Sequence, residues 1–265
     1  MSENPEPTPP PTADPPEPPP RLWFPPRFSE EPAERDPFWD YGDLLVFAGF
    51  TFPCLLAASA AVSVAFRILH LHLALKTWEL LATQFAFYAL LSGVLALLFR
   101  VKYDRPFWLS LGWVAPRPPL LSIAAGGAGL ATAILLLGIL IRAPRVETPL
   151  TKMLKDPTSL LLVALFGSIV APVCEELLFR GFLQPLLVRS MGAAAGIVVT
   201  ALPFGLLHLQ EYGNSWRHVL LIALSGAGFG WLRHATGSTR ASATMHAAYN
   251  AFQFALLLAS QALPH

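Results

Sequence analysis

The stretch LLVFAGFTFPCLLAASAAVSVAF, residues 44–66, decides the fold class because it contains no charged side chain, and Arg67 follows it directly. A helix needs roughly 20 predominantly apolar residues to cross the hydrocarbon core of a bilayer. Residues 80–99 and 120–141 form two more uncharged stretches of similar length, and each is followed by an arginine. These three stretches predict membrane-spanning helices.

Four less regular apolar stretches occupy the second half of the chain, at residues 158–174, 191–207, 219–232 and 241–264. Pro172 interrupts the first of them, and a proline is best tolerated in the first turn of a helix. We therefore expect a new helix to begin at Pro172. The whole pattern predicts an all-α, polytopic transmembrane helix bundle of about seven helices, or eight if residues 172–189 form a separate one.

The composition supports a membrane class. Hydrophobic residues make up 54% of the chain and charged residues only 13%, whereas a soluble domain carries about 25% charged residues. The net charge is +1, so the chain lacks the basic balance expected for a nucleic-acid partner. The two cysteines, Cys54 and Cys174, lie in apolar stretches and are too few for a disulfide framework or a zinc ribbon.

Two segments suit positions outside the spans. Residues 1–20 consist mostly of Pro, Glu, Thr and Asp, and such a composition has too little apolar surface to offset the entropy of ordering. We expect a disordered Pro-rich tether there, followed at residues 22–41 by an aromatic segment at the membrane surface. The stretch PFWLSLGWV at 106–114 is too short to span and suits an interfacial loop or short helix.

Ionisable side chains inside membrane spans are costly and mark functional sites. The first cluster is EELLFR at 175–180. Glu176 and Arg180 are spaced i, i+4 and can form an ion pair. Glu175 points about 100° away on the same helix, without a partner close in sequence. An unpaired carboxylate in apolar surroundings is a candidate general base, although acids that cap a helix end would give the same pattern.

Two further clusters follow on later apolar segments. They are FGLLH at 204–208 and HAAYN at 246–250, in which His246 and Asn250 share one helix face. Alone, each is equally consistent with an interfacial histidine or with hydrogen bonds between helices. Together with Glu175 they favour activation of a water molecule. Glu175 would take its proton, His208 would hold the water, and His246 and Asn250 would stabilise an oxyanion.

The three clusters resemble the motifs of the CPBP intramembrane proteases, also called Abi or CAAX-processing type II proteases. EELLFR matches their EExxxR motif, FGLLH their FxxxH motif and HAAYN their HxxxN motif. The resemblance covers residues 158 to about 258. It implies that Glu175 and His208 hold the catalytic water and that His246 and Asn250 form the oxyanion site. Glu176, Arg180 and Phe204 would have supporting roles.

The need for a metal is open from the sequence. No HExxH motif is present, so the chain lacks the usual zinc-protease helix. If zinc is bound, Glu175, His208 and His246 would supply three N/O ligands. We favour a metal-free glutamate mechanism with no cofactor.

These patterns predict an intramembrane endopeptidase, a hydrolase acting on a membrane-embedded or lipid-anchored protein or peptide. The alternatives are a proton-coupled transporter, in which Glu and His would carry protons, and a non-catalytic scaffold or immunity protein of the same fold. We expect three regions: 1–40 as tail and interfacial segment, 41–157 as N-terminal membrane helices, and 158–265 as catalytic membrane helices. The expected location is the plasma membrane of a prokaryote.

Overall fold

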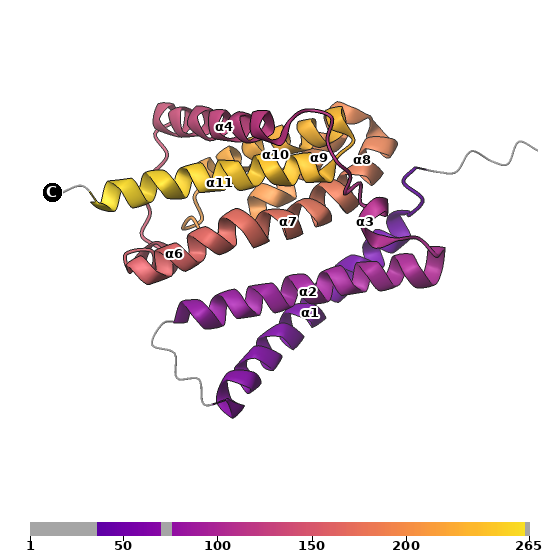
Figure 1. Ribbon diagram of the computed structural model, residues 1–265, viewed down its shortest axis with the longest axis horizontal. Coiled ribbons are helices and arrows are strands. Elements are labelled where there is room, and N and C mark those ends of the chain that lie inside the picture. The colour runs from indigo at the N-terminus through magenta and orange to yellow at the C-terminus, as the bar shows by residue number, and fades with distance from the viewer. Residues whose placement is uncertain (1–35, 70–75, 263–265) are drawn as a thin grey trace, which may run out of the picture. The chain divides into compact units, whose positions relative to one another are not determined.

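The computed structural model describes residues 36–69 and 76–262, and within these ranges every regular element is a helix (Figure 1). All of them belong to one unit, Arg35–His265. The expected Pro-rich tail at 1–20 lies outside the described residues. The helices are α1 (Tyr41–Ile68), α2 (Lys76–Tyr103), α3 (Phe107–Ser110), α4 (Leu120–Leu140), α5 (Pro149–Met153), α6 (Pro157–Leu165), η1 (Phe166–Val170), α7 (Ala171–Glu176), η2 (Leu177–Leu183), α8 (Gln184–Met191), α9 (Ala193–Leu207), α10 (Trp216–Thr236) and α11 (Thr239–Ala262).

The spans follow from length and composition. Four helical segments are long and apolar enough to cross a membrane: α1, α2, α4 and the continuous run Pro157–Met191. We call this run, which joins α6, η1, α7, η2 and α8, the composite helix. Helix α9 is apolar but shorter, and α10 and α11 carry more polar side chains. The chain is therefore an all-α membrane bundle, as the uncharged stretches predicted.

The expected helix start at Pro172 is wrong, because the composite helix continues through it. A proline inside an α-helix lacks the N–H for its own hydrogen bond, and its ring clashes with the carbonyl one turn earlier. Here a π-helical turn precedes the proline, and the Ala171 N–H bonds to the carbonyl of Phe166. The wider turn accommodates the ring. The same device precedes Pro185, where the Gln184 N–H bonds to Phe179.

Helix α11 holds the second half together. It packs along α4 on one side and against η1 and α7 on the other, while α9 packs between α8 and α10 (Figure 1). Helices α1 and α2 pack on each other as a hairpin. The composite helix thus has α11 along one side, and residues of α1 and α2 approach it on another.

The segment before α1 is anchored in the protein interior. Trp39 is only 2% exposed, and its indole Nε1 donates a hydrogen bond to the Phe182 carbonyl at 3.1 Å. It packs with Leu95, Phe99 and Leu111 in one apolar cluster. Trp39 therefore fixes the start of α1 against η2, whereas residues 22–35 of the expected membrane-surface segment lie outside the described residues.

The segment 106–114 contains the short helix α3, as expected for an interfacial element. Its end is attached to the turn between α10 and α11, because Ser238 Oγ donates to the Val114 carbonyl at 2.6 Å. Gly181 of η2 lies against Leu111 so closely that a Cβ there would meet the Leu111 carbonyl oxygen at 3.0 Å. This contact ties the segment to the composite helix.

Candidate active site

Glu175 and Glu176 are adjacent on α7 but occupy different surroundings. The Glu176 side chain is fully buried, whereas the Glu175 side chain is 15% exposed and lines a cavity. Arg180 Nη1 donates to Glu176 Oε1 at 2.9 Å, and Ser242 Oγ donates to Glu176 Oε2. The i, i+4 ion pair expected from the sequence is present. The Glu176 carboxylate is therefore hydrogen-bonded inside the bundle, and of the two carboxylates only that of Glu175 faces the cavity.

Arg180 is fully buried and connects three helices. Besides Glu176, it donates from Nη2 to the Gly226 carbonyl of α10 at 2.7 Å. Its guanidinium lies 4.3 Å from the centre of the Phe204 ring of α9, a favourable cation–π contact. A Cβ at Gly226 would come within 2.8 Å of both Arg180 and Phe204. A glycine is therefore required where α10 approaches this cation.

His246 is oriented by Glu176. Its Nδ1 lies 3.0 Å from Glu176 Oε1, and its Nε2 lies 4.0 Å from Glu175 Oε2. The carboxylate accepts, so Nδ1 carries the hydrogen and Nε2 is directed toward Glu175. The ring stacks on Phe229 with centroids 4.5 Å apart. The histidine of the HAAYN motif is thus held rigidly beside the candidate base.

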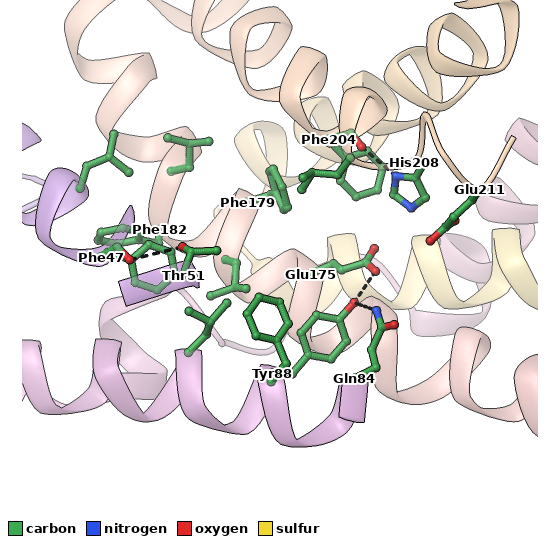
Figure 2. Close-up of a pocket in the computed structure, with 16 residues that line it drawn as sticks. Phe47, Thr51, Gln84, Tyr88, Glu175, Phe179, Phe182, Phe204, His208 and Glu211 are labelled. Atoms are coloured by element: carbon green, nitrogen blue, oxygen red, sulfur yellow. Dashed lines mark hydrogen bonds between the residues drawn. The ribbon is translucent and has the colours of Figure 1, made fainter. Parts of the chain in front are cut away.

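His208 ends α9 and lines the same cavity as Glu175. Its Nδ1 lies 2.8 Å from the Phe204 carbonyl. A carbonyl oxygen only accepts, so Nδ1 donates and Nε2 is left as an acceptor. Figure 2 shows the side chains of Glu175, His208 and Glu211 pointing toward one another.

Asn250 does not line this cavity. Its Nδ2 donates to the Gly167 carbonyl at 2.7 Å, and Gly167 belongs to the π turn η1. The Ala171 N–H that would normally reach Gly167 bonds to Phe166 instead, and Pro172 has no N–H. Asn250 therefore satisfies a carbonyl that the π turn leaves without its helical partner. One of the two amide hydrogens remains for another acceptor.

The cavity measures about 380 Å³, within the range of small-molecule sites. Its polar end combines Glu175 and His208 with three side chains that the sequence analysis did not select: Gln84, Tyr88 and Glu211. Its other end is mostly apolar: Phe47 and Phe182 lie there beside Thr51 (Figure 2). The apolar walls come from α1, α2, η2 and α9, and include Leu44, Phe87, Leu91, Leu178, Phe179 and Leu183.

The missed residues carried only weak signals in the sequence. Gln84 and Tyr88 are uncharged polar residues spaced i, i+4 in a span otherwise read as apolar, and Tyr88 Oη donates to Glu175 Oε1 at 2.7 Å. Glu211 follows the FGLLH motif by three residues. The weakly polar surroundings raise the pKa of Glu211, the nearby His208 opposes that rise, and Glu175 adds to it.

Glu175, His208 and His246 are the candidate ligands for a metal ion. In the described part of the chain, the side chains of His, Cys, Asp and Glu form no group of three that could hold a metal ion. Nδ1 of both histidines is engaged. The reaction steps below use protein groups and water alone.

Comparison with known families agrees with the three motifs. Residues 157–252 match the family described as type II CAAX prenyl endopeptidase Rce1-like. No curated protein and no solved structure matches this chain. The matched segment contains Glu175, Glu176, Arg180, Phe204, His208, His246 and Asn250. With its four apolar candidate spans, the chain is an integral membrane protein, and its residues 157–252 are similar to the Rce1-like type II CAAX prenyl endopeptidases.

Proposed function

We propose that this protein is an intramembrane endopeptidase that uses Glu175 to activate water. The observation that carries the proposal is the arrangement around Glu175. This carboxylate lines a cavity with His208, and its Oε2 lies 4.0 Å from His246 Nε2. Its neighbour Glu176 is neutralised separately by Arg180. A carboxylate with a free oxygen, beside two imidazoles and a cavity, suits general-base chemistry.

The proposed reaction uses one water molecule per peptide bond. His208 Nε2 and Glu175 Oε2 both accept hydrogen bonds from the water, which directs an oxygen lone pair at the scissile carbonyl carbon. Glu175 takes one proton as the new C–O bond forms. The proton then passes to the leaving nitrogen as the C–N bond breaks, and Glu175 returns to its carboxylate form. The products are a new carboxyl group and an amine.

The oxyanion of the tetrahedral intermediate would be stabilised by His246 and Asn250. With Nδ1–H on Glu176, a protonated His246 presents Nε2–H toward the reacting group. Asn250 has one amide hydrogen beyond the one donated to Gly167. Neither His246 nor Asn250 is among the residues that line the cavity, so we expect both contributions to require a substrate that reaches past it.

The substrate that we propose is a membrane-embedded or lipid-anchored protein or peptide. The family description names prenylated CAAX ends, and an apolar chamber next to the polar end suits an apolar group near the scissile bond. We place the enzyme in the plasma membrane of a prokaryote.

The experiment compares membrane proteomes of cells that carry wild type or Glu175→Gln at equal expression. We expect uncut precursors of one or a few membrane-associated proteins to accumulate in the variant, with new termini seen only in wild type. Identical termini in both strains would contradict the proposal. Proton-coupled solute uptake that depends on Glu175 in vesicles would favour a transporter instead.

A further inference from the structure

Helix α2 lies outside the family match, yet it contacts the candidate base directly. Tyr88 is only 6% exposed, and its hydroxyl donates to Glu175 Oε1 at 2.7 Å. Gln84, one turn earlier on α2, donates from Nε2 to the Tyr88 hydroxyl oxygen at 2.9 Å. Figure 2 shows the resulting chain from Gln84 through Tyr88 to Glu175.

The direction of this chain is fixed by its donors. An amide NH₂ only donates and a carboxylate only accepts, so the Tyr88 hydroxyl must receive from Gln84 and give its one hydrogen to Glu175. Hydrogen bonds in series polarise one another. The bond to the carboxylate is also charge-assisted and so stronger than a neutral one.

The Tyr88 contact makes the two oxygens of Glu175 unequal. Oε1 accepts from Tyr88, whereas no described side chain donates a hydrogen bond to Oε2. Oε2 is the oxygen that lies 4.0 Å from His246 Nε2. The contact thus selects one oxygen of the carboxylate for the proton transfer and holds the side chain in one orientation.

Tyr88 is itself held in place. Its ring is stacked nearly parallel to Phe166 of η1, with an interplanar angle of 9° and centroids 6.5 Å apart. At the start of α2, the hydroxyl groups of Thr77 (α2) and Ser159 (α6) form a buried hydrogen bond of 2.7 Å. Both contacts fix the register of α2 against the composite helix, which is the condition for a precise bond to Glu175.

We propose that Tyr88, supported by Gln84, is a positioning residue that holds Glu175 with Oε2 as the proton-accepting oxygen. The proposal rests on the proposed peptidase function. It adds a contribution from α2, outside the segment that carries the three motifs. Tyr88 acts through Glu175 and touches the reaction only by that route.

The kinetic test uses purified full-length protein in lipid vesicles and an internally quenched peptide that ends in a farnesylated CAAX sequence. Tyr88→Phe keeps the ring and removes only the hydroxyl. Losing a hydrogen bond to a charged group corresponds to about a 10- to 100-fold effect, and we expect it in kcat, with KM changed less than roughly twofold. An unchanged kcat would overturn the proposal.

Tyr103→Phe is the matched control. Tyr103 lies on the same helix and also donates its hydroxyl to a carboxylate, that of Asp43, away from the cavity. It should retain the wild-type kcat. Gln84→Leu should lower kcat less than Tyr88→Phe and should add nothing in the Tyr88→Phe background, because Gln84 acts through Tyr88. Full additivity of the two effects would contradict a single chain.

Infrared difference spectra separate this proposal from the proposed function. The spectrum of wild type minus Tyr88→Phe should contain a carboxylate stretching change that is absent when both proteins also carry Glu175→Gln. The same difference in both backgrounds, or no carboxylate change, would overturn the positioning role. A wild type that leaves the peptide uncut while showing this band change would count against the choice of substrate or the peptidase function, and would leave the Tyr88–Glu175 contact standing.

Discussion

The composite helix and the α1–α2 hairpin supply opposite walls of the same cavity and are stabilised in different ways. Buried polar groups centred on Glu176 and Arg180 join the composite helix to α10 and α11, and Arg180 also lies over the Phe204 ring of α9. The hairpin is mostly apolar, and its side-chain hydrogen bonds to the composite helix, among the described residues, come from Tyr88, Thr77 and Tyr41. The family match covers only the first of these regions. The residues of the first motif therefore lie on the composite helix, on one side of the cavity. The hairpin on the other side carries none of the three motifs, but its Tyr88 donates a hydrogen bond to Glu175.

The largest expected effect concerns the buried ion pair in the family-matched region. Arg180→Ala leaves Glu176 as an uncompensated buried charge, and breaking such a pair costs about 3–5 kcal/mol. We expect a large fall in the thermal unfolding midpoint in detergent, together with loss of activity. Arg180→Ala that unfolds at the wild-type temperature would show that the pair does not stabilise the bundle.

The hairpin offers a comparison for that result. Lys102 of α2 pairs with Asp43 of α1 at 2.6 Å, but the lysine side chain is 48% exposed. The Asp43 side chain is buried, but it also accepts hydrogen bonds from the Tyr103 hydroxyl and the Asp40 N–H, so it keeps two donors when the half-exposed lysine is removed. Lys102→Ala should therefore shift the unfolding midpoint far less than Arg180→Ala. Equal shifts would remove the distinction between the two regions.

An intermediate effect is expected at Asn250. Asn250→Ala leaves the half-buried Gly167 carbonyl of the π turn without a donor; a fully buried unsatisfied acceptor costs about 1–3 kcal/mol, so we expect a cost toward the lower end of that range. The control is Gln261→Ala, because Gln261 is also an amide of α11 that donates to a backbone carbonyl, that of Leu154, but at the surface. We expect a lower unfolding midpoint only for Asn250→Ala. Loss of activity without loss of stability would leave Asn250 with a role in the reaction alone.

The smallest expected effect is a pH dependence at Glu211. Its pKa is raised in the folded protein, so the unfolded chain releases this proton at lower pH; stability therefore falls as the pH rises from the unfolded to the folded pKa and stays lowered above the folded pKa. Glu211→Gln should therefore raise the unfolding midpoint at pH 7. The gain should shrink as the pH falls through the folded pKa and vanish below the ordinary glutamate value of about 4.3.

Glu147→Gln is the comparison, because the pKa of Glu147 is shifted in the opposite direction from that of Glu211. Glu147 lies 3.0 Å from Lys155, and that contact lowers the pKa of its carboxyl. Its replacement should give no gain in stability at pH 7. A gain at Glu211 that persists unchanged at pH 4 would mean that ionisation of Glu211 is not its cause.

Much of the fold could be predicted from the sequence, because a long stretch without charged residues is a strong signal for a membrane-spanning helix. The i, i+4 rule also predicted the Glu176–Arg180 pair. The predicted helix start at Pro172 was wrong. A proline is a strong sequence signal for a helix start, whereas the π turn that lets the helix continue through it has no comparable signal in the sequence. The contacts of Tyr88 with Glu175 and of Asn250 with Gly167 join residues far apart in sequence, so no local pattern reveals them. Selecting such contacts requires knowing which helix faces meet.

In the proposed mechanism, Glu175 activates water without a metal ion. The most direct measurement follows cleavage of the farnesylated peptide by wild type and Glu175→Gln after exhaustive chelation, with metal content determined by elemental analysis of the same samples. We expect wild type to remain active at far less than one metal ion per chain, and Glu175→Gln to be folded but inactive. Activity in Glu175→Gln would contradict the role of Glu175. Activity that disappears with zinc and returns in proportion to added zinc would contradict the metal-free mechanism.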